Sequence, residues 1–160
     1  MSEDIDNILK EYGQQMVDAT AEILVDDTRG MIMNREALTN PEQEGSGVEA
    51  VAELSAKTIN KYKKGFSNPS LPRFRTGAML DGIKAEYGDL TDTVVTLARY
   101  SEEQQTGEWS SGFPNPVPRP FFGISDRALK QATAECQKIV GQFIAATNGR
   151  TIQGEITVSA

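Results

Sequence analysis

The stretch that decides the fold is Val117-Pro118-Arg119-Pro120-Phe121-Phe122-Gly123, which leads through Ser125 into a long helical pattern. Pro118 and Pro120, together with Pro114 and Pro116 just before this stretch, alternate with other residues. These prolines hold the backbone extended and remove amide hydrogen-bond donors. The segment is therefore neither a central strand nor a helix interior. In an extended chain Phe121 and Phe122 point to opposite sides, so one ring can close a core while the other reaches outward. This pattern favours a stiff docking strut; a plain loop that covers the start of the next helix is an equally good interpretation.

Apolar residues at three- and four-residue spacing predict a long helix at each end of the chain. The first covers residues 4–24 and can continue to about Leu38. The last begins after Ser125, whose hydroxyl can cap it, and ends at Asn148-Gly149. Cys136, the single cysteine, lies in the apolar stripe of this last helix, where a buried and inert thiol is expected. The stripe comprises Leu129, Ala132, Cys136, Ile139, Val140 and Phe143.

Shorter elements are predicted between the two long helices. Strands at 83–87 and 93–100 flank a hairpin turn at 88–92, and a short terminal strand covers 151–158. Loops are predicted at 39–47, which can be mobile, and at 65–75. Helical turns are predicted at 48–54, from Ser55 onward and at 76–80. We therefore predict one α+β domain over residues 1–160, with the terminal helices packed on a small antiparallel sheet, a Pro-rich strut and long loops.

Composition excludes several kinds of site. The chain has 160 residues, no histidine and one cysteine, so Ser-His-Asp and Cys-His nucleophile arrangements, histidine zinc sites and thiolate clusters are excluded in the isolated chain. Phosphate-binding glycine motifs are missing too. The carboxylate pairs Asp89/Asp92 and Glu102/Glu103 are expected to be solvated. We predict no enzyme activity, no cofactor, no metal and no membrane span, in a soluble protein made in a cytoplasm.

Charge is distributed unevenly along the chain. The net charge is −7, yet residues 54–80 carry six basic side chains and no acidic one, whereas residues 1–53 are strongly acidic. Two segments of opposite charge favour self-association or docking between complementary faces of separate molecules. Ion pairing between the two segments within one fold explains the charge distribution equally well. The basic segment 57–75 also has interleaved aromatic residues, which leaves weak DNA contact open.

Four segments in order carry a family resemblance. They are Asn40-Pro41-Glu42-Gln43-Glu44-Gly45, then Leu54-Ser55 with Thr58 and Lys61, then Arg75-Thr76-Gly77-Ala78-Met79-Leu80-Asp81-Gly82-Ile83, and finally the strut itself through Ser125. With them the chain resembles the virion-morphogenesis or tail-completion family of tailed bacteriophages, the Mu-like protein G and tail-completion protein S group. Three departures stand out. The strut lacks an alanine between Pro118 and Arg119, and Gly82 replaces a serine. A Tyr-Ala-x-x-His-Gln-x-Gly segment is reduced to Tyr100 followed by Gln104-Gln105-Thr106-Gly107.

The resemblance implies a structural protein of the phage neck or tail. Its expected location is the virion, in an oligomeric ring that completes the tail or joins it to the head. Its expected partners are further copies of itself and neighbouring neck or tail proteins such as the tail terminator, connector or tube. The alternative is a non-enzymatic adaptor outside the virion. For either role the candidate interface residues are Arg119, Phe121, Phe122, Trp109, Arg75, Lys63 and Lys64.

Overall fold

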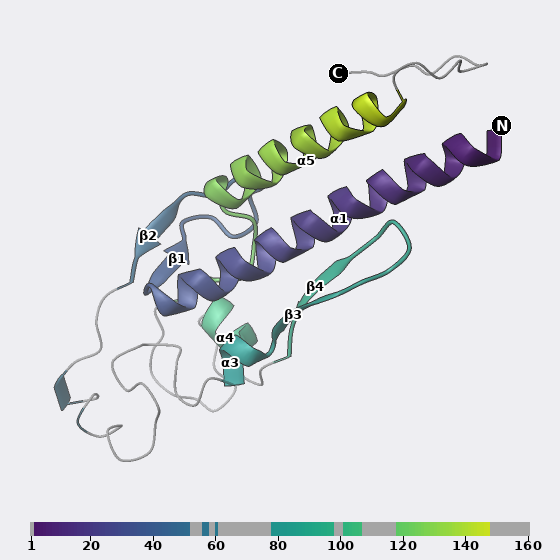
Figure 1. Ribbon diagram of the computed structural model, residues 1–160. Coiled ribbons are helices and arrows are strands. Elements are labelled where there is room, and N and C mark those ends of the chain that lie inside the picture. Colours follow the sequence, from purple (N-terminus) through teal and green to yellow (C-terminus); the bar gives the residue numbers. More distant parts are fainter. Residues whose placement is uncertain are drawn as a thin grey trace.

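Two long helices run side by side in opposite directions in the computed structural model, which describes residues 2–51, 56–57, 60, 78–97, 101–106 and 118–147 (Figure 1). Helix α1 spans Ser2–Met33 and helix α5 spans Asp126–Thr147. Near the start of α1, Tyr12 meets Phe143 of α5 edge to face, with ring centroids 5.5 Å apart. Both terminal helices predicted from periodicity are thus present.

The first helix is longer than the 4–24 pattern but stops before Leu38. The Asn34 amide donates to the Gly30 carbonyl, and Arg35 then adopts a left-handed conformation with φ of 55°. This conformation is rare for a residue with a side chain and ends the helix. The chain turns directly into a strand, where Leu38 becomes a core residue.

A hairpin replaces one of the predicted helices. Strand β1, Glu36–Leu38, pairs antiparallel with β2, Val48–Ala50, so the prediction of a helix at 48–54 is wrong in its described part. Local helix propensity is a weak preference. Here the antiparallel pairing of β2 with β1, which contains the buried Leu38, outweighs it. The predicted loop 39–47 joins the two strands, and its Ser46 is buried.

The second hairpin follows the prediction closely. A short helix α3, Ala78–Asp81, leads into β3, Ile83–Glu86, which pairs antiparallel with β4, Thr93–Thr96. Residues 101–106, expected only to be polar, form the short helix α4, Ser101–Thr106. Four expectations fall mostly or wholly outside the described residues: the helix from Ser55, the loop 65–75, the stop at Asn148-Gly149 and the strand 151–158.

The core lies where these elements meet. Helix α1 contacts α5 as well as strands β3 and β4 (Figure 1). Val25, Ile32, Ile83 and Phe121 form the buried cluster, and partly buried side chains from α3, both strands of the second hairpin and Phe122 pack around it. The fold is therefore α+β, with terminal helices packed on small antiparallel sheets, as predicted.

The buried side of α5 differs from the predicted stripe. Ala128, Ala132 and Ile139 are buried, whereas Leu129 and Val140 are exposed. Cys136 is only half-buried, and its sulfur lies 3.7 Å from the Thr20 hydroxyl of α1. The expectation of a buried Cys136 is therefore too strong.

Candidate functional site

The described end of the Pro-rich strut lies between α4 and β1. The Arg119 amide donates to the Gln104 carbonyl at 2.8 Å, and the Leu38 amide donates to the Pro120 carbonyl at 2.7 Å. These two bonds hold the strut from opposite sides, one from a helix and one from a strand. Its extended backbone, which the prolines prescribe, leaves these groups free to bond to neighbours rather than within the segment.

Gln105 binds the strut with a single side chain. Its Oε1 accepts from the amides of both Phe121 and Phe122 at 3.0 Å, and its Nε2 donates to the Phe122 carbonyl at 2.7 Å. A primary amide has both an acceptor and a donor, so it satisfies three backbone groups that no strand or helix satisfies here. We did not predict this role. No local pattern in the sequence pointed to it, because Gln105 and Phe121 lie 16 residues apart.

The two phenylalanines of the strut both pack inward. Phe121 is 0% exposed and belongs to the buried cluster, whereas Phe122 is half-buried and packs against that cluster. Their rings meet edge to face at 6.4 Å. Phe121 is therefore a core residue, and its prediction as an interface residue is corrected. The strut is not fully extended at this point, so the alternation that would send neighbouring rings to opposite sides does not apply.

Gly123 allows a close crossing at the end of the strut. A Cβ at this position would lie 2.7 Å from Leu38 Cδ1 and 3.0 Å from the Pro41 carbonyl oxygen. Beyond it, the Ile124 carbonyl accepts from the amides of Gly45 and Ser46. The loop 39–47 and the strut therefore hold each other in place, and this loop is the first segment on which the family resemblance rests.

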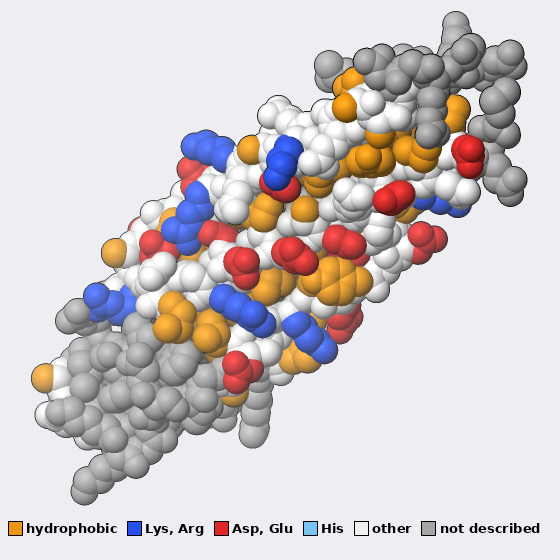
Figure 2. Space-filling model, in the orientation of Figure 1, with side chains coloured by type: hydrophobic (Ala, Val, Ile, Leu, Met, Phe, Trp, Pro, Cys, Tyr) orange, Lys and Arg blue, Asp and Glu red, His pale blue; other side chains and the backbone are white. Residues whose placement is uncertain are grey.

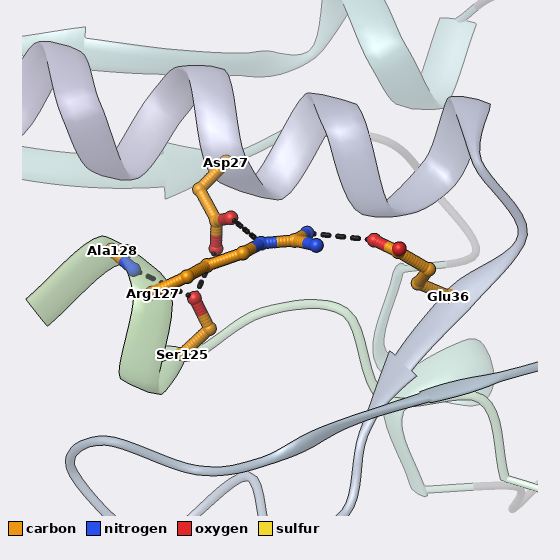
Figure 3. Close-up of polar contacts among 5 residues, drawn as sticks. All are labelled: Asp27, Glu36, Ser125, Arg127 and Ala128. Carbon is orange, nitrogen blue, oxygen red and sulfur yellow. Dashed lines mark hydrogen bonds and ion pairs between the residues drawn. The ribbon is translucent and has the colours of Figure 1, made fainter. Parts of the chain in front are cut away.

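A polar network joins the start of α5 to α1 and β1 (Figure 3). The Ser125 hydroxyl donates to Asp27 Oδ2 at 2.7 Å and accepts from the Ala128 amide at 3.1 Å, which confirms Ser125 as the helix cap. Arg127 binds Asp27 and, at 2.7 Å, Glu36. The hydrogen bond to Glu36, together with Asp27, raises the pKa of the Arg127 guanidinium above its ordinary value. Asp27 is therefore a structural carboxylate whose side chain is only 9% exposed.

The carboxylate pairs predicted from sequence are not the pair that the fold assembles. Asp92 lies beside Asp18 of α1 rather than beside its turn neighbour Asp89, and its Oδ1 accepts from the Gly88 amide at 3.0 Å. Burial raises the pKa of the Asp92 carboxyl above its ordinary value; the Gly88 amide opposes this shift and Asp18 adds to it. The expectation that Asp92 is simply solvated is thus corrected, because only the docking of the hairpin on α1 brings the two carboxyls together.

Replacing Asp92 tests this pair through the pH dependence of folding. A raised pKa in the folded state means that folding favours the protonated Asp92 carboxyl. Protonated Asp92 therefore stabilises the fold at low pH, and this stabilisation is lost as the pH rises through the pKa of Asp92 in the folded state. We expect Asp92→Asn to unfold at higher urea concentration than the native protein near pH 7, with the difference shrinking toward about pH 4. Asp89→Asn, at an exposed position of the same turn, is the control and should show no such trend. Equal pH trends for both variants would refute the assignment.

Apolar side chains also reach the surface. Figure 2 shows hydrophobic side chains gathered over α1 and α5 near the chain ends, where Leu9, Val140 and Ile144 are exposed. On the other side of α1, an open groove of about 370 Å³ runs beside β3. It is lined by Glu22, Val25, Asp26, Arg29, Lys84, Ala85 and Tyr87.

The structure leaves part of the predicted interface undescribed. Arg119 and Phe122 lie together on the strut and are both half-buried. Trp109, Arg75, Lys63 and Lys64 lie outside the described residues, as does most of the basic segment 57–75. Within the described ranges, no group of three or more His, Cys, Asp or Glu side chains could hold a metal ion. No helix in that part of the chain is long and apolar enough to cross a membrane.

Comparison with known proteins adds no relative. The chain matches no protein-family model, no curated protein and no solved structure.

Proposed function

We propose that this chain is a structural protein of a tailed-phage virion, acting in tail completion or head–tail joining at the neck as part of an oligomeric ring. The proposal rests on the family resemblance of four separate segments. Its partners are then further copies of the chain and adjoining neck or tail proteins. The proposed location is the assembled particle.

One structural observation supports the proposal: within the described residues, parts of three of the resembling segments converge on a single core. Met79, Leu80 and Ile83 come from the Thr-Gly segment, and Phe121 and Phe122 come from the strut, about 40 residues later. The segment at 40–45 closes over Gly123, at the end of the same strut. A chance match to three short motifs would scatter them over the fold. Residues that together build one packed unit are what a shared fold requires.

The strut also suits an interface by its rigidity. Gln105, β1 and the buried Phe121 hold the backbone that carries Arg119 and Phe122, whose half-buried side chains keep part of their surface exposed. A side chain on a fixed backbone loses little conformational entropy when a partner docks, and arginine and aromatic residues are enriched among such contacts. An adaptor outside the virion would use the same surface, so the two functions are separated by an assembly test.

Substitutions on the strut are expected to block assembly while leaving the subunit folded. In a phage that lacks its own copy of the gene, we expect Arg119→Ala or Phe122→Ala to leave filled heads and tails apart, because an interface contact worth about 2 kcal/mol or more is lost in every subunit. Electron microscopy and titre of the lysate measure this, and circular dichroism measures folding. Lys130→Ala, at an exposed position on α5, is the control and should complement normally. Infectious particles from both strut variants, or unfolding of both, would contradict the proposal.

A further inference from the structure

Four exposed apolar side chains belong to one end of the α1–α5 pair. They are Leu9 on α1, Leu90 on the turn of the second hairpin, and Val140 and Ile144 on α5, and each is 38% to 59% exposed. Figure 2 shows hydrophobic side chains gathered over this end of the two helices. Scattered apolar residues on a surface need no explanation, whereas a contiguous group marks a place where another apolar segment binds. The relative positions of the four side chains therefore matter.

The helix register places three of them on the same flank. The Thr20 hydroxyl and the Cys136 sulfur meet across the two helices, 3.7 Å apart, and so mark this flank on both. Leu9 lies about three full turns before Thr20, so it shares the face of α1 that carries Thr20. Val140 and Ile144 follow Cys136 by about one and two turns. Because the helices run in opposite directions, both displacements lead toward the same end of the pair (Figure 1).

The hairpin turn brings the fourth side chain to this flank. The Leu90 amide donates to the Gln14 Oε1 of α1 at 2.7 Å. A Cβ on Gly13 would lie only 3.2 Å from Leu90 Cδ2, so the Leu90 side chain rests directly on α1 at that position. Gly13 is one helical turn from Leu9, on the same face. Leu9, Leu90, Val140 and Ile144 thus form one apolar patch that three elements share.

The sequence that follows α5 matches this patch in polarity. Residues 148–160 lie outside the described residues and begin about one turn beyond Ile144. Asn148-Gly149 can reverse the chain there, since glycine adopts a left-handed conformation without steric cost. Over residues 151–158 apolar and polar positions then alternate, with Ile152, Gly154, Ile156 and Val158 on one side of an extended chain. Such a side gains free energy when an apolar surface covers it.

Reach and tethering favour this segment over a separate molecule. An extended chain advances about 3.3 Å per residue, so Ile152 can lie up to about 17 Å from Thr147. Ile144 and Val140 are separated by only about 6 Å of helix rise, so the patch is well within that range. A segment joined directly to α5 meets the patch at an effective concentration in the millimolar range and loses no overall translational freedom.

From these observations we infer that residues 151–158 fold back along α5 and bury Ile152, Ile156 and Val158 on the apolar patch of the same molecule. The contact covers Val140 and Ile144 and closes the flank of the helix pair. It is a property of the single chain and does not rest on the proposed function in the virion.

Thermal unfolding of the full chain tests this contact. We expect Ile144→Ser and Ile156→Ser each to lower the Tm by about 2–4 °C, because each variant loses buried apolar area. The double variant should lower the Tm about as much as one of them alone, because both substitutions remove the same contact. Gln153→Ser, on the polar side of the segment, is the control and should leave the Tm unchanged. An unchanged Tm for Ile156→Ser, or fully additive shifts in the double variant, would overturn the inference.

A spin label separates the same molecule from a second copy as the occupant. A nitroxide is attached to Thr157→Cys in a Cys136→Ala background, and methyl NMR signals are compared before and after its reduction with ascorbate. We expect strong broadening of the methyl signals of the apolar patch and none at Leu38, near the other end of α1 (Figure 1).

A mixed sample completes the test. Spin-labelled chains without isotope are combined with isotope-labelled chains without spin label, and the broadening should then vanish. Broadening that persists in the mixture would identify a second copy on the patch, and no broadening in either sample would leave the patch uncovered. Either result overturns the inference. Neither bears on phage assembly, which the complementation test measures separately.

Discussion

Phe121→Ala is expected to cost about 3–5 kcal/mol of folding free energy, which is a large part of the stability of a domain of this size. The side chain is fully buried in the cluster with Val25, Ile32 and Ile83. Its removal would leave a cavity among α1, β3 and the strut, three elements that share this one contact region. Urea unfolding followed by circular dichroism measures the loss. We expect the variant to be partly unfolded at 37 °C.

Phe122→Ala is the matched control for this loss. The neighbouring ring has the same chemistry but is only half-buried, so its removal should cost about 1–2 kcal/mol. A smaller truncation, Phe121→Leu, should fall between the two. Equal losses at the two phenylalanines would show that the strut packs differently, and would return Phe121 to the surface role predicted from sequence.

Gln105→Ala is expected to destabilise the protein by about 2–4 kcal/mol. Without the side-chain amide, the backbone N–H groups of Phe121 and Phe122 lose their acceptor, and a buried unsatisfied donor costs about 1–3 kcal/mol. Phe121 itself lies in the core, where water cannot readily replace the bond. Urea unfolding measures the total loss, and amide hydrogen exchange at the two phenylalanines should accelerate more than exchange in the middle of α1.

Substitution with glutamate separates the parts played by the Gln105 amide. Gln105→Glu keeps an acceptor for both amides but loses the donor to the Phe122 carbonyl, so it should retain more stability than Gln105→Ala. Gln104→Ala is a second control, because that residue contributes to the strut through its backbone carbonyl. A Gln104→Ala variant as unstable as Gln105→Ala would argue against the specific role of the Gln105 side chain.

Features encoded by neighbouring residues could be predicted from sequence. The two long helices, the Ser125 cap and the hairpin at 83–96 depend on periodicity, a capping hydroxyl and a polar turn, and all three are present. Each of these signals acts over a few residues, so the chain carries it wherever the segment lies in space. Errors occurred where local preference was weak. Residues 48–50 were predicted to be helical but form β2, where they pair with Glu36–Leu38.

Only part of the candidate site could be predicted from sequence, because sequence signals act between residues that are close along the chain. The strut and its stiffness follow from proline chemistry. The prediction that Phe121 serves an interface was wrong, because that ring is fully buried. The pairings of Gln105 with the strut, Arg127 with Asp27 and Asp18 with Asp92 join residues 16 to 100 positions apart. No local pattern encodes such a distance.

Sequence alone therefore determined where the two long helices begin and which segment is stiff. Tertiary structure decided which ring is buried and which carboxylates meet. The physical reason is that propensity and capping act between neighbours along the chain, whereas burial and charge pairing depend on which surfaces the packed helices bring together.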